Sequence, residues 1–461
     1  MSSVSAQGRT PPPDPQAHPP DPAALLRSAR YLRLLALAAV LGVPISAVAY
    51  GFLALVGLLQ HWVYSDLPRA LGLTPPPWWW PAPPLVLAGL LVGAAIRFLP
   101  GRGGKSPADG FSESGPPPPS ALPGIAFAAL AGLSLGAVIG PEAPLIALGG
   151  GLAVCAVRLT RGAGGPTATA VIGATGSFAA VSTLLGSPLL GAFLLMEVSG
   201  LGGPMLGLVL LPGLLASGLG SLIFIGLGRW TGLGTFSLQV PDIPGFMEPN
   251  LAQFGWAIVI GLIASVLGSA VRWFALRVRP SVEPRPLVAV PLAGLVVAAL
   301  AIGFAAATGH AASDVLFSGQ DALGGLLTDS ASYPVGTLLL LIGAKGLAYS
   351  VSLAAFRGGP IFPAMFLGAA LGMVLSHLPG LPLVAGAAMG IGAMSVVMLR
   401  LPLTSVLLAS LLLASDEIAL MPLVIVAVVV AHVVTARLTP ARPAPASAPA
   451  AAEQPPGDVV A

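Results

Sequence analysis

The stretch GPEAPLIALG, residues 140–149, places a glutamate between two prolines inside a run that is otherwise almost wholly apolar. A second stretch, GPIFPAMFLG at residues 359–368, repeats its glycine and proline spacing at positions one, five and ten, 219 residues later (359 − 140 = 219). Glycine permits unusual backbone angles, and a proline in the first helical turn costs no hydrogen bond. Both stretches therefore predict helix starts, and their match predicts a duplicated fold.

The match extends further along the chain. Each stretch precedes a second proline-led element, SPLLGAFLL around Pro188 and LPLTSVLLA around Pro402. A chance match in a chain rich in glycine and proline is the alternative, but the shared order of two elements favours duplication. Gly- and Pro-interrupted segments at corresponding places in two halves point to a transport site at their interface.

The composition indicates an integral membrane protein. Of 461 residues, 56% are hydrophobic and only 8% are charged, whereas a soluble domain carries about 25% charge. The net charge of +3 gives no indication of nucleic-acid binding. A single cysteine, Cys155, excludes an internal disulfide, and the five scattered histidines lack the spacing of a metal site. We therefore expect no metal, no cofactor and no nucleic-acid partner, and a lipid bilayer as the surrounding medium.

The chain divides into one membrane domain and two tails. Residues 1–24 and 439–461 are rich in proline or alanine and are expected to be disordered. Residues 25–438 form the predicted transmembrane domain, with approximate halves 31–228 and 251–438. Several apolar segments are shorter than the roughly 20 residues that a spanning helix needs. The fold class expected is therefore an all-α integral membrane protein built from long and broken helices.

Helix starts at membrane depth predict an anion site. A helix N-terminus exposes unpaired N–H groups and carries about half a positive charge, so it binds anions without a fixed cation. The amides of Ile361 and Phe362, after Gly359, are the predicted donors of the second half. Those near Ala143, after Gly140, are the predicted donors of the first half.

Glu142 stands where such an anion would bind. A charge at the bilayer centre costs on the order of 3 kcal/mol, and an ionisable group there is a functional candidate by default. We interpret Glu142 as a tethered anion that closes the site when ionised and opens it when protonated or displaced. The alternative is a simple helix cap at a water-exposed end.

These residues resemble the CLC family of chloride channels and proton-coupled chloride transporters, of the prokaryotic type without CBS domains. GPEAP and GGPIFP are similar to two of the family's pore elements, and GKSP at residues 104–107 is similar to a third. The resemblance covers roughly residues 31–438. It implies an inverted-repeat bundle of tilted and broken helices that forms a homodimer with one pore per subunit. It also implies that Glu142 is the gate, and that the anion is bound by residues of the three elements: Gly104, Ser106, Pro107, Gly140, Ala143, Gly359, Ile361 and Phe362.

The sequence departs from the family pattern at several positions. Gly104 takes the place of the pore serine, and Ser106 lies nearby but elsewhere in the motif. No tyrosine follows Tyr349, so the family's C-terminal pore tyrosine has no match. In LLMEVSG, Glu197 matches the first acid of the transporters' inner pair and Val198 replaces the second. Glu197 is thus the candidate for a proton path, with a helix cap or an ion pair as the alternative.

Three cations lie close to the three predicted helix starts: Lys105, Lys345 and Arg357. Each is a candidate for drawing anions toward the pore, because fixed positive charge raises local anion concentration. For Lys345 the alternative is a lysine that reaches to the membrane interface, where its ammonium group stays hydrated.

The function expected is transport of chloride or a similar small anion across the cell membrane. Arg27, Arg30 and Arg33 at the first helix predict a cytoplasmic N-terminus, and Arg437 and Arg442 predict a cytoplasmic C-terminus. A proton-coupled antiporter of chloride, fluoride or nitrate is the alternative. A membrane-embedded enzyme is a third hypothesis, disfavoured because the apolar segments carry no GxSxG element or paired acids that would serve as a catalytic site.

Overall fold

The computed structural model describes residues 27–110, 115–159, 166–199, 204–233, 248–412 and 417–439, and within these ranges the named elements are all helices. The predicted tails, 1–24 and nearly all of 439–461, lie outside the described residues. The first half comprises α2 (Ala29–His61), α3 (Leu67–Ala70), α4 (Ala82–Phe98), α5 (Leu122–Ser134), α6 (Glu142–Leu159), α7 (Pro166–Leu184), α8 (Pro188–Ser199) and α9 (Pro204–Thr231). The second half comprises α10 (Leu251–Val282), α11 (Pro286–Thr308), α12 (Gln320–Thr328), α13 (Val335–Ala355), α14 (Ile361–Ser376), α15 (Leu383–Leu399), α16 (Pro402–Leu412) and α17 (Glu417–Leu438). The expected all-α fold is confirmed.

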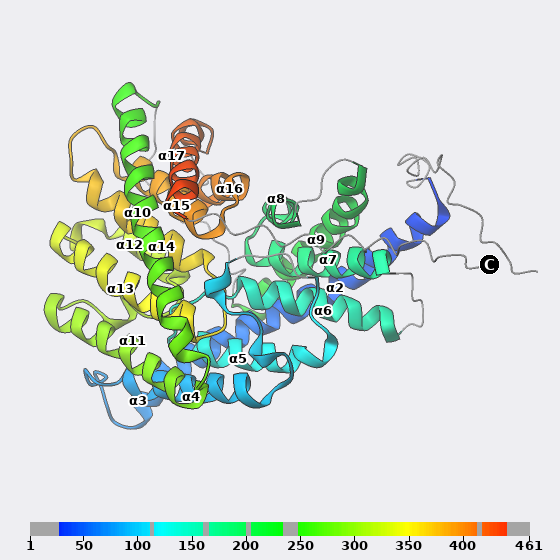
Figure 1. Ribbon diagram of the computed structural model, residues 1–461, viewed down its shortest axis with the longest axis horizontal. Coiled ribbons are helices and arrows are strands. Elements are labelled where there is room, and N and C mark those ends of the chain that lie inside the picture. The colour runs from blue at the N-terminus through cyan, green and yellow to red at the C-terminus, as the bar shows by residue number, and fades with distance from the viewer. Residues whose placement is uncertain are drawn as a thin grey trace, which may run out of the picture.

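Short helical turns separate some of these helices. They are a π-turn η1 (Trp62–Asp66) after α2, and 3₁₀ turns η2 (Pro100–Gly103), η3 (Pro107–Asp109), η4 (Pro119–Ala121), η5 (Ala312–Asp314) and η6 (Ser330–Ser332). In Figure 1, helices α6 to α9 gather on one side of the molecule and α12 to α17 on the other.

The two halves repeat the same local packing. Helix α6 begins at Glu142 and α14 at Ile361, again 219 residues apart (361 − 142 = 219). In the first half a Cβ added to Gly149 would overlap the backbone of Gly176 on α7, and in the second a Cβ on Gly368 would overlap Gly390 on α15. Small residues allow helix backbones to approach closely where lipid provides no hydrophobic driving force. The glycine at position ten of each repeated stretch therefore allows an equivalent close helix–helix contact in each half.

The outer helices suit a lipid environment. Seven helices of the described chain are long and apolar enough to cross a membrane, among them α10, α11 and α13. Large apolar side chains on α11 face outward, for example Val288 and Leu292, which are 68% and 59% exposed. Helices α6, α14 and α15 are far more buried, and α14 and α15 are shorter than a full span. Their broken ends are consequently enclosed by protein, which is one of the settings where irregular backbone is tolerated at membrane depth.

Candidate functional site

The two repeated glycine-proline elements meet inside the molecule. The Gly140 amide donates to the Gly359 carbonyl at 2.8 Å, and the Gly359 amide donates to the Gly140 carbonyl at 2.6 Å. Each glycine thus pairs with its own counterpart in the other half. Such reciprocal pairing of equivalent residues is the signature of a two-fold relation between two copies of a motif. The helix starts of α6 and α14 are therefore held side by side.

Glu142 bridges these two starts. It is the first residue of α6 and is fully buried, with 0% exposure. The Ile361 amide, at the first residue of α14, donates a short hydrogen bond to Glu142 Oε1. Ile361 is the counterpart of Glu142 in the repeat, so the acid of one half binds the amide of the other. Glu142 Oε2 is buried and has no hydrogen-bond partner among the described residues.

Gly140 and Gly359 make room for this carboxylate. A Cβ added to either glycine would overlap the carboxyl group of Glu142, and at both positions the nearest atoms all belong to that side chain. Neither glycine has a positive φ, so close approach rather than backbone conformation requires glycine here. The result is a cradle, formed by Gly140, Gly359 and the Ile361 amide, that holds one carboxylate.

The start of α14 carries the chemistry expected of an anion site. Pro360 is its N-cap, and Ile361 and Phe362 are 0% and 1% exposed. Unpaired amides at such a helix end attract negative charge, more strongly where water is excluded. Ala143 lies half-buried in the first turn of α6. The Glu142 carboxylate is bound at this helix start, and anion binding by Ile361, Phe362 and Ala143 stays a prediction.

The third predicted element, GKSP at residues 104–107, lies against the C-terminal end of α13. Gly104 has a positive φ of 97°, and a Cβ on it would contact Ile125. The Ser106 hydroxyl lies 3.5 Å from the Leu353 carbonyl, at the limit of a hydrogen bond, and Pro107 is buried. The contacts described for Gly104 and Ser106 do not include Glu142, so their assignment to the anion site stays a prediction.

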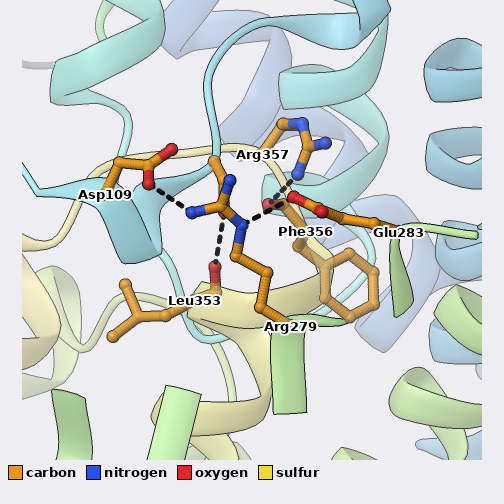
Figure 2. Close-up of polar contacts among 7 residues, drawn as sticks. Asp109, Arg279, Glu283, Leu353, Phe356 and Arg357 are labelled. Carbon is orange, nitrogen blue, oxygen red and sulfur yellow. Dashed lines mark hydrogen bonds and ion pairs between the residues drawn. The ribbon is translucent and has the colours of Figure 1, made fainter. Parts of the chain in front are cut away.

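A charged cluster surrounds this element (Figure 2). Arg279 on α10 contacts Asp109 of η3 through Nη1 and donates from Nε to Glu283 at 2.6 Å. Arg357, just before the start of α14, donates from Nη1 to the Phe356 carbonyl at 3.3 Å. Its buried Nε has no hydrogen-bond partner among the described residues. Arg357 therefore lies beside the pore elements with part of its donor capacity unused, whereas Lys105 is exposed at the surface.

Comparison with known proteins agrees with this geometry. The family model described as voltage gated chloride channel matches residues 89–436.

The chain belongs to the voltage-gated chloride channel (CLC) family.

Among curated relatives, "Putative ion-transport protein YfeO" of Escherichia coli O1:K1 / APEC is 30% identical over 364 residues, 77% of this chain and 82% of that protein. The protein of the same name from Shigella boydii serotype 4 (strain Sb227) is equally similar.

Solved CLC structures share the fold. A slow cyanobacterial Cl⁻/H⁺ antiporter aligns with a TM-score of 0.73 and 19% identity, over 88% of this chain and 95% of that one. A CLC-type fluoride/proton antiporter aligns with a TM-score of 0.63 and 20% identity over the same shares. At this identity the alignments establish the arrangement of helices alone.

Lys345 is buried, which contradicts one of its two sequence interpretations. It lies on α13, is fully buried, and its ammonium is 4.4 Å from the centre of the Phe366 ring. The same ammonium donates to the backbone carbonyls of Asp314, Val315 and Leu316 at 3.0–3.1 Å, and the Phe317 carbonyl lies 3.4 Å away. The alternative of a lysine reaching the interface is wrong, because the charge is satisfied in the interior by carbonyl oxygens. Attraction of anions by Lys345 stays a prediction.

Glu197, the first-acid match to the CLC pattern, caps a helix of the other half. Its Oε1 accepts from the Leu403 amide at 2.8 Å, and its Oε2 accepts from the Thr404 amide and hydroxyl at 2.8 and 2.6 Å. These residues form the first turn of α16. The cap alternative thus describes its present contacts, while a proton path through Glu197 stays a prediction.

One residue at the CLC-like site was missed by the sequence analysis. Tyr349, noted only as the last tyrosine, is fully buried on α13, and its hydroxyl donates to the Pro360 carbonyl at 2.7 Å. The available signal was a tyrosine in an apolar segment, since a buried hydroxyl needs a partner.

For metals, no group of three or more His, Cys, Asp or Glu side chains gathers within the described ranges.

Proposed function

We propose that this protein carries chloride or a similar small anion across the membrane, through a pore at the paired starts of α6 and α14 that Glu142 gates. The observation that carries the proposal is the hydrogen bond from the Ile361 amide to the Glu142 carboxylate. A helix start that binds a carboxylate in a buried place binds a small anion by the same interaction. Displacing the side chain frees the amide for that anion.

The cradle supports gating more than a purely structural role. Glu142 Oε2 is buried without a hydrogen-bond partner among the described residues, which is costly for an ionised carboxylate. Protonation removes the charge and weakens the bond to the Ile361 amide. The side chain is then released more readily, so the open state is favoured as the pH falls.

Membership of the CLC family supports the anion class, and the choice of anion belongs to the proposal. The structural neighbours are titled a Cl⁻/H⁺ antiporter and a fluoride/proton antiporter, so both halides are candidate substrates. The pore-serine position is Gly104, which contributes no hydroxyl to selectivity. We propose chloride as the first anion to test, with fluoride and nitrate beside it.

Proton coupling is the second candidate function, because the two neighbours' titles name protons. We propose weak or absent coupling in this chain. Val198 cannot exchange a proton, and both carboxylate oxygens of Glu197 are engaged at the start of α16. The proton would then have to follow water rather than a second acid.

The surroundings of the pore complete the proposal. Lys105 and Arg357 would raise the local anion concentration, and Lys345 would add a buried positive charge near α14. We also propose a homodimer in the cell membrane, supported by CLC membership. We propose that both termini are cytoplasmic, supported by the arginines at the start of α2 and by Arg437 at the end of α17.

Purified protein in liposomes tests the function. Chloride efflux under a gradient, measured with an anion electrode and a potassium ionophore, should exceed that of empty liposomes. Efflux of fluoride and of nitrate is measured in the same way and compared with that of chloride. Wild-type protein that passes none of these anions would end the proposal. The reversal potential, measured across a proton gradient at equal chloride, should shift little, and a large shift would establish coupling instead.

A further inference from the structure

The peptide group between Pro360 and Ile361 is hydrogen-bonded on both sides. Its N–H, on Ile361, donates to Glu142 Oε1. Its C=O, on Pro360, accepts from the Tyr349 hydroxyl at 2.7 Å. Tyr349, Ile361 and Glu142 are all fully buried. A single peptide unit therefore joins a phenol on α13 to the carboxylate on α6.

Two physical effects follow from this arrangement. The N–H and C=O of a trans peptide point in opposite directions, so a hydroxyl that holds the carbonyl on one side directs the amide to the other. A donor on the carbonyl also polarises the peptide and strengthens the bond that its N–H makes, by roughly 10–30% per bond. Both effects act on the Ile361 N–H, the group proposed to bind the anion.

We propose that Tyr349 is a positioning residue for anion binding: its hydroxyl fixes and polarises the Pro360–Ile361 peptide so that the Ile361 amide faces the pore as a strong donor. The inference rests on the function proposed above, in which that amide binds the transported anion after Glu142 leaves. Tyr349 does not touch the anion, because its only hydroxyl proton is used on the carbonyl.

The position of the peptide makes such a device necessary. Its orientation is set by ψ of Pro360 and φ of Ile361, and the proline ring restricts only the φ of Pro360. Rotation of the peptide would turn the Pro360 carbonyl toward the cradle, where its negative end would repel both Glu142 and an anion. The Tyr349 hydroxyl holds the carbonyl away from that orientation.

Chloride titration in a gate-free background tests the inference. The parent is Glu142→Gln, in which no carboxylate competes for the amide, and chloride binding to purified full-length protein is measured by calorimetry. Adding Tyr349→Phe keeps the ring and removes the hydroxyl, and should weaken chloride binding about two- to fivefold, because the Ile361 amide loses the group that polarises and orients its peptide. Thermal stability is recorded for each variant.

Tyr50→Phe is the matched control. Tyr50 is a buried tyrosine on α2 whose hydroxyl also makes a hydrogen bond, to Thr231 at 2.5 Å, away from the cradle. It should leave chloride affinity unchanged. A variant with 3,5-difluorotyrosine at position 349, a stronger donor of similar shape, should bind chloride at least as tightly as the parent. This variant tests the role of the hydroxyl if Tyr349→Phe does not fold.

The outcomes separate the two proposals. Equal chloride affinity in the parent and in Tyr349→Phe would overturn the role of Tyr349, as would an equal weakening by Tyr50→Phe, or a difluorotyrosine variant that binds chloride more weakly than the parent. None of these results would affect the proposed function. A parent that binds no chloride, in protein that also fails to conduct it, would refute the proposed function and this inference with it.

Discussion

Glu142 and Glu197 are both acids of the first half that bind amides at helix starts of the second half, but they are held in different ways. Glu197 has both oxygens engaged, by two amides and a hydroxyl of α16, and is half-buried. Glu142 has one oxygen engaged by the Ile361 amide, the other unpartnered among the described residues, and no exposure. An acid with both oxygens hydrogen-bonded stabilises the contact between the two halves. A buried acid with one oxygen unpartnered is held less firmly and is easier to displace.

The difference also explains why one motif can serve two purposes. A helix start accepts any anion, and its neighbours decide whether the occupant stays. At α16 the Thr404 hydroxyl adds a third hydrogen bond that retains the acid. At α14 the neighbours are Gly140 and Gly359, which provide space but no further side-chain donor.

Removing the acid from each site should separate a gate from a cap, and the largest effect is expected at Glu142. Glu142→Ala should raise chloride flux about tenfold, equivalent to ~1.4 kcal/mol, and remove its dependence on pH, because no carboxylate competes for the Ile361 amide. Efflux from liposomes between pH 5 and pH 8 measures both. Asp329→Asn, an exposed acid outside the site, is the control. Unchanged flux and pH profile in Glu142→Ala would contradict gating.

Filling the cradle with a methyl group should displace the Glu142 carboxylate. Gly359→Ala places a methyl group on the Glu142 carboxylate and should cost about 1–3 kcal/mol of unfolding free energy while raising flux. In a Glu142→Ala background the same substitution should cost much less, because its nearest neighbours are gone. Thermal unfolding of the four proteins in this cycle measures the difference. Gly343→Ala, at an open position of α13, should be tolerated. Equal costs of Gly359→Ala in both backgrounds would show that the cradle does not hold the Glu142 carboxylate.

The arginines before the two helix starts extend the comparison. Arg357 precedes α14 beside the pore elements, while Arg400 precedes α16 and donates to Thr439 at 2.7 Å. Arg357→Met should lower chloride flux about two- to threefold at low ionic strength and less at high ionic strength, because salt screens the attraction. Arg357→Lys should retain most of the flux, and Arg400→Met should change it little. An Arg357→Met effect that does not depend on salt would assign the residue a structural role.

The smallest effect on transport is expected at the cap. Glu197→Gln should lower the unfolding free energy by about 1 kcal/mol, since the neutral amide caps α16 less well, and should leave chloride flux unchanged. Flux and thermal unfolding are measured on the same preparation. If the reversal potential shifts with a proton gradient in wild type and this shift disappears in Glu197→Gln, the residue carries protons and is more than a cap.

Much of the fold was accessible from the sequence, because membrane helices are recognised from composition and their breaks from glycine and proline. The start of α6 at Glu142 and of α14 at Ile361 follows from GPEAP and GPIFP. The roles of Lys345 and Tyr349 could not be predicted in this way. Their partners are backbone carbonyls of the 314–317 segment and of Pro360, and every residue type carries a carbonyl, so no sequence pattern marks them.

The sequence by itself determined that this is a duplicated membrane protein with two matched helix starts and one acid between them. Those properties depend on local chemistry: hydrophobicity, backbone freedom and the helix N-terminus. Only the tertiary structure decided that Gly140 pairs with Gly359, that Glu142 binds Ile361, and that Glu197 belongs to α16. These contacts join residues about 200 positions apart, and they arise from the way the two halves close on each other, which local patterns do not encode.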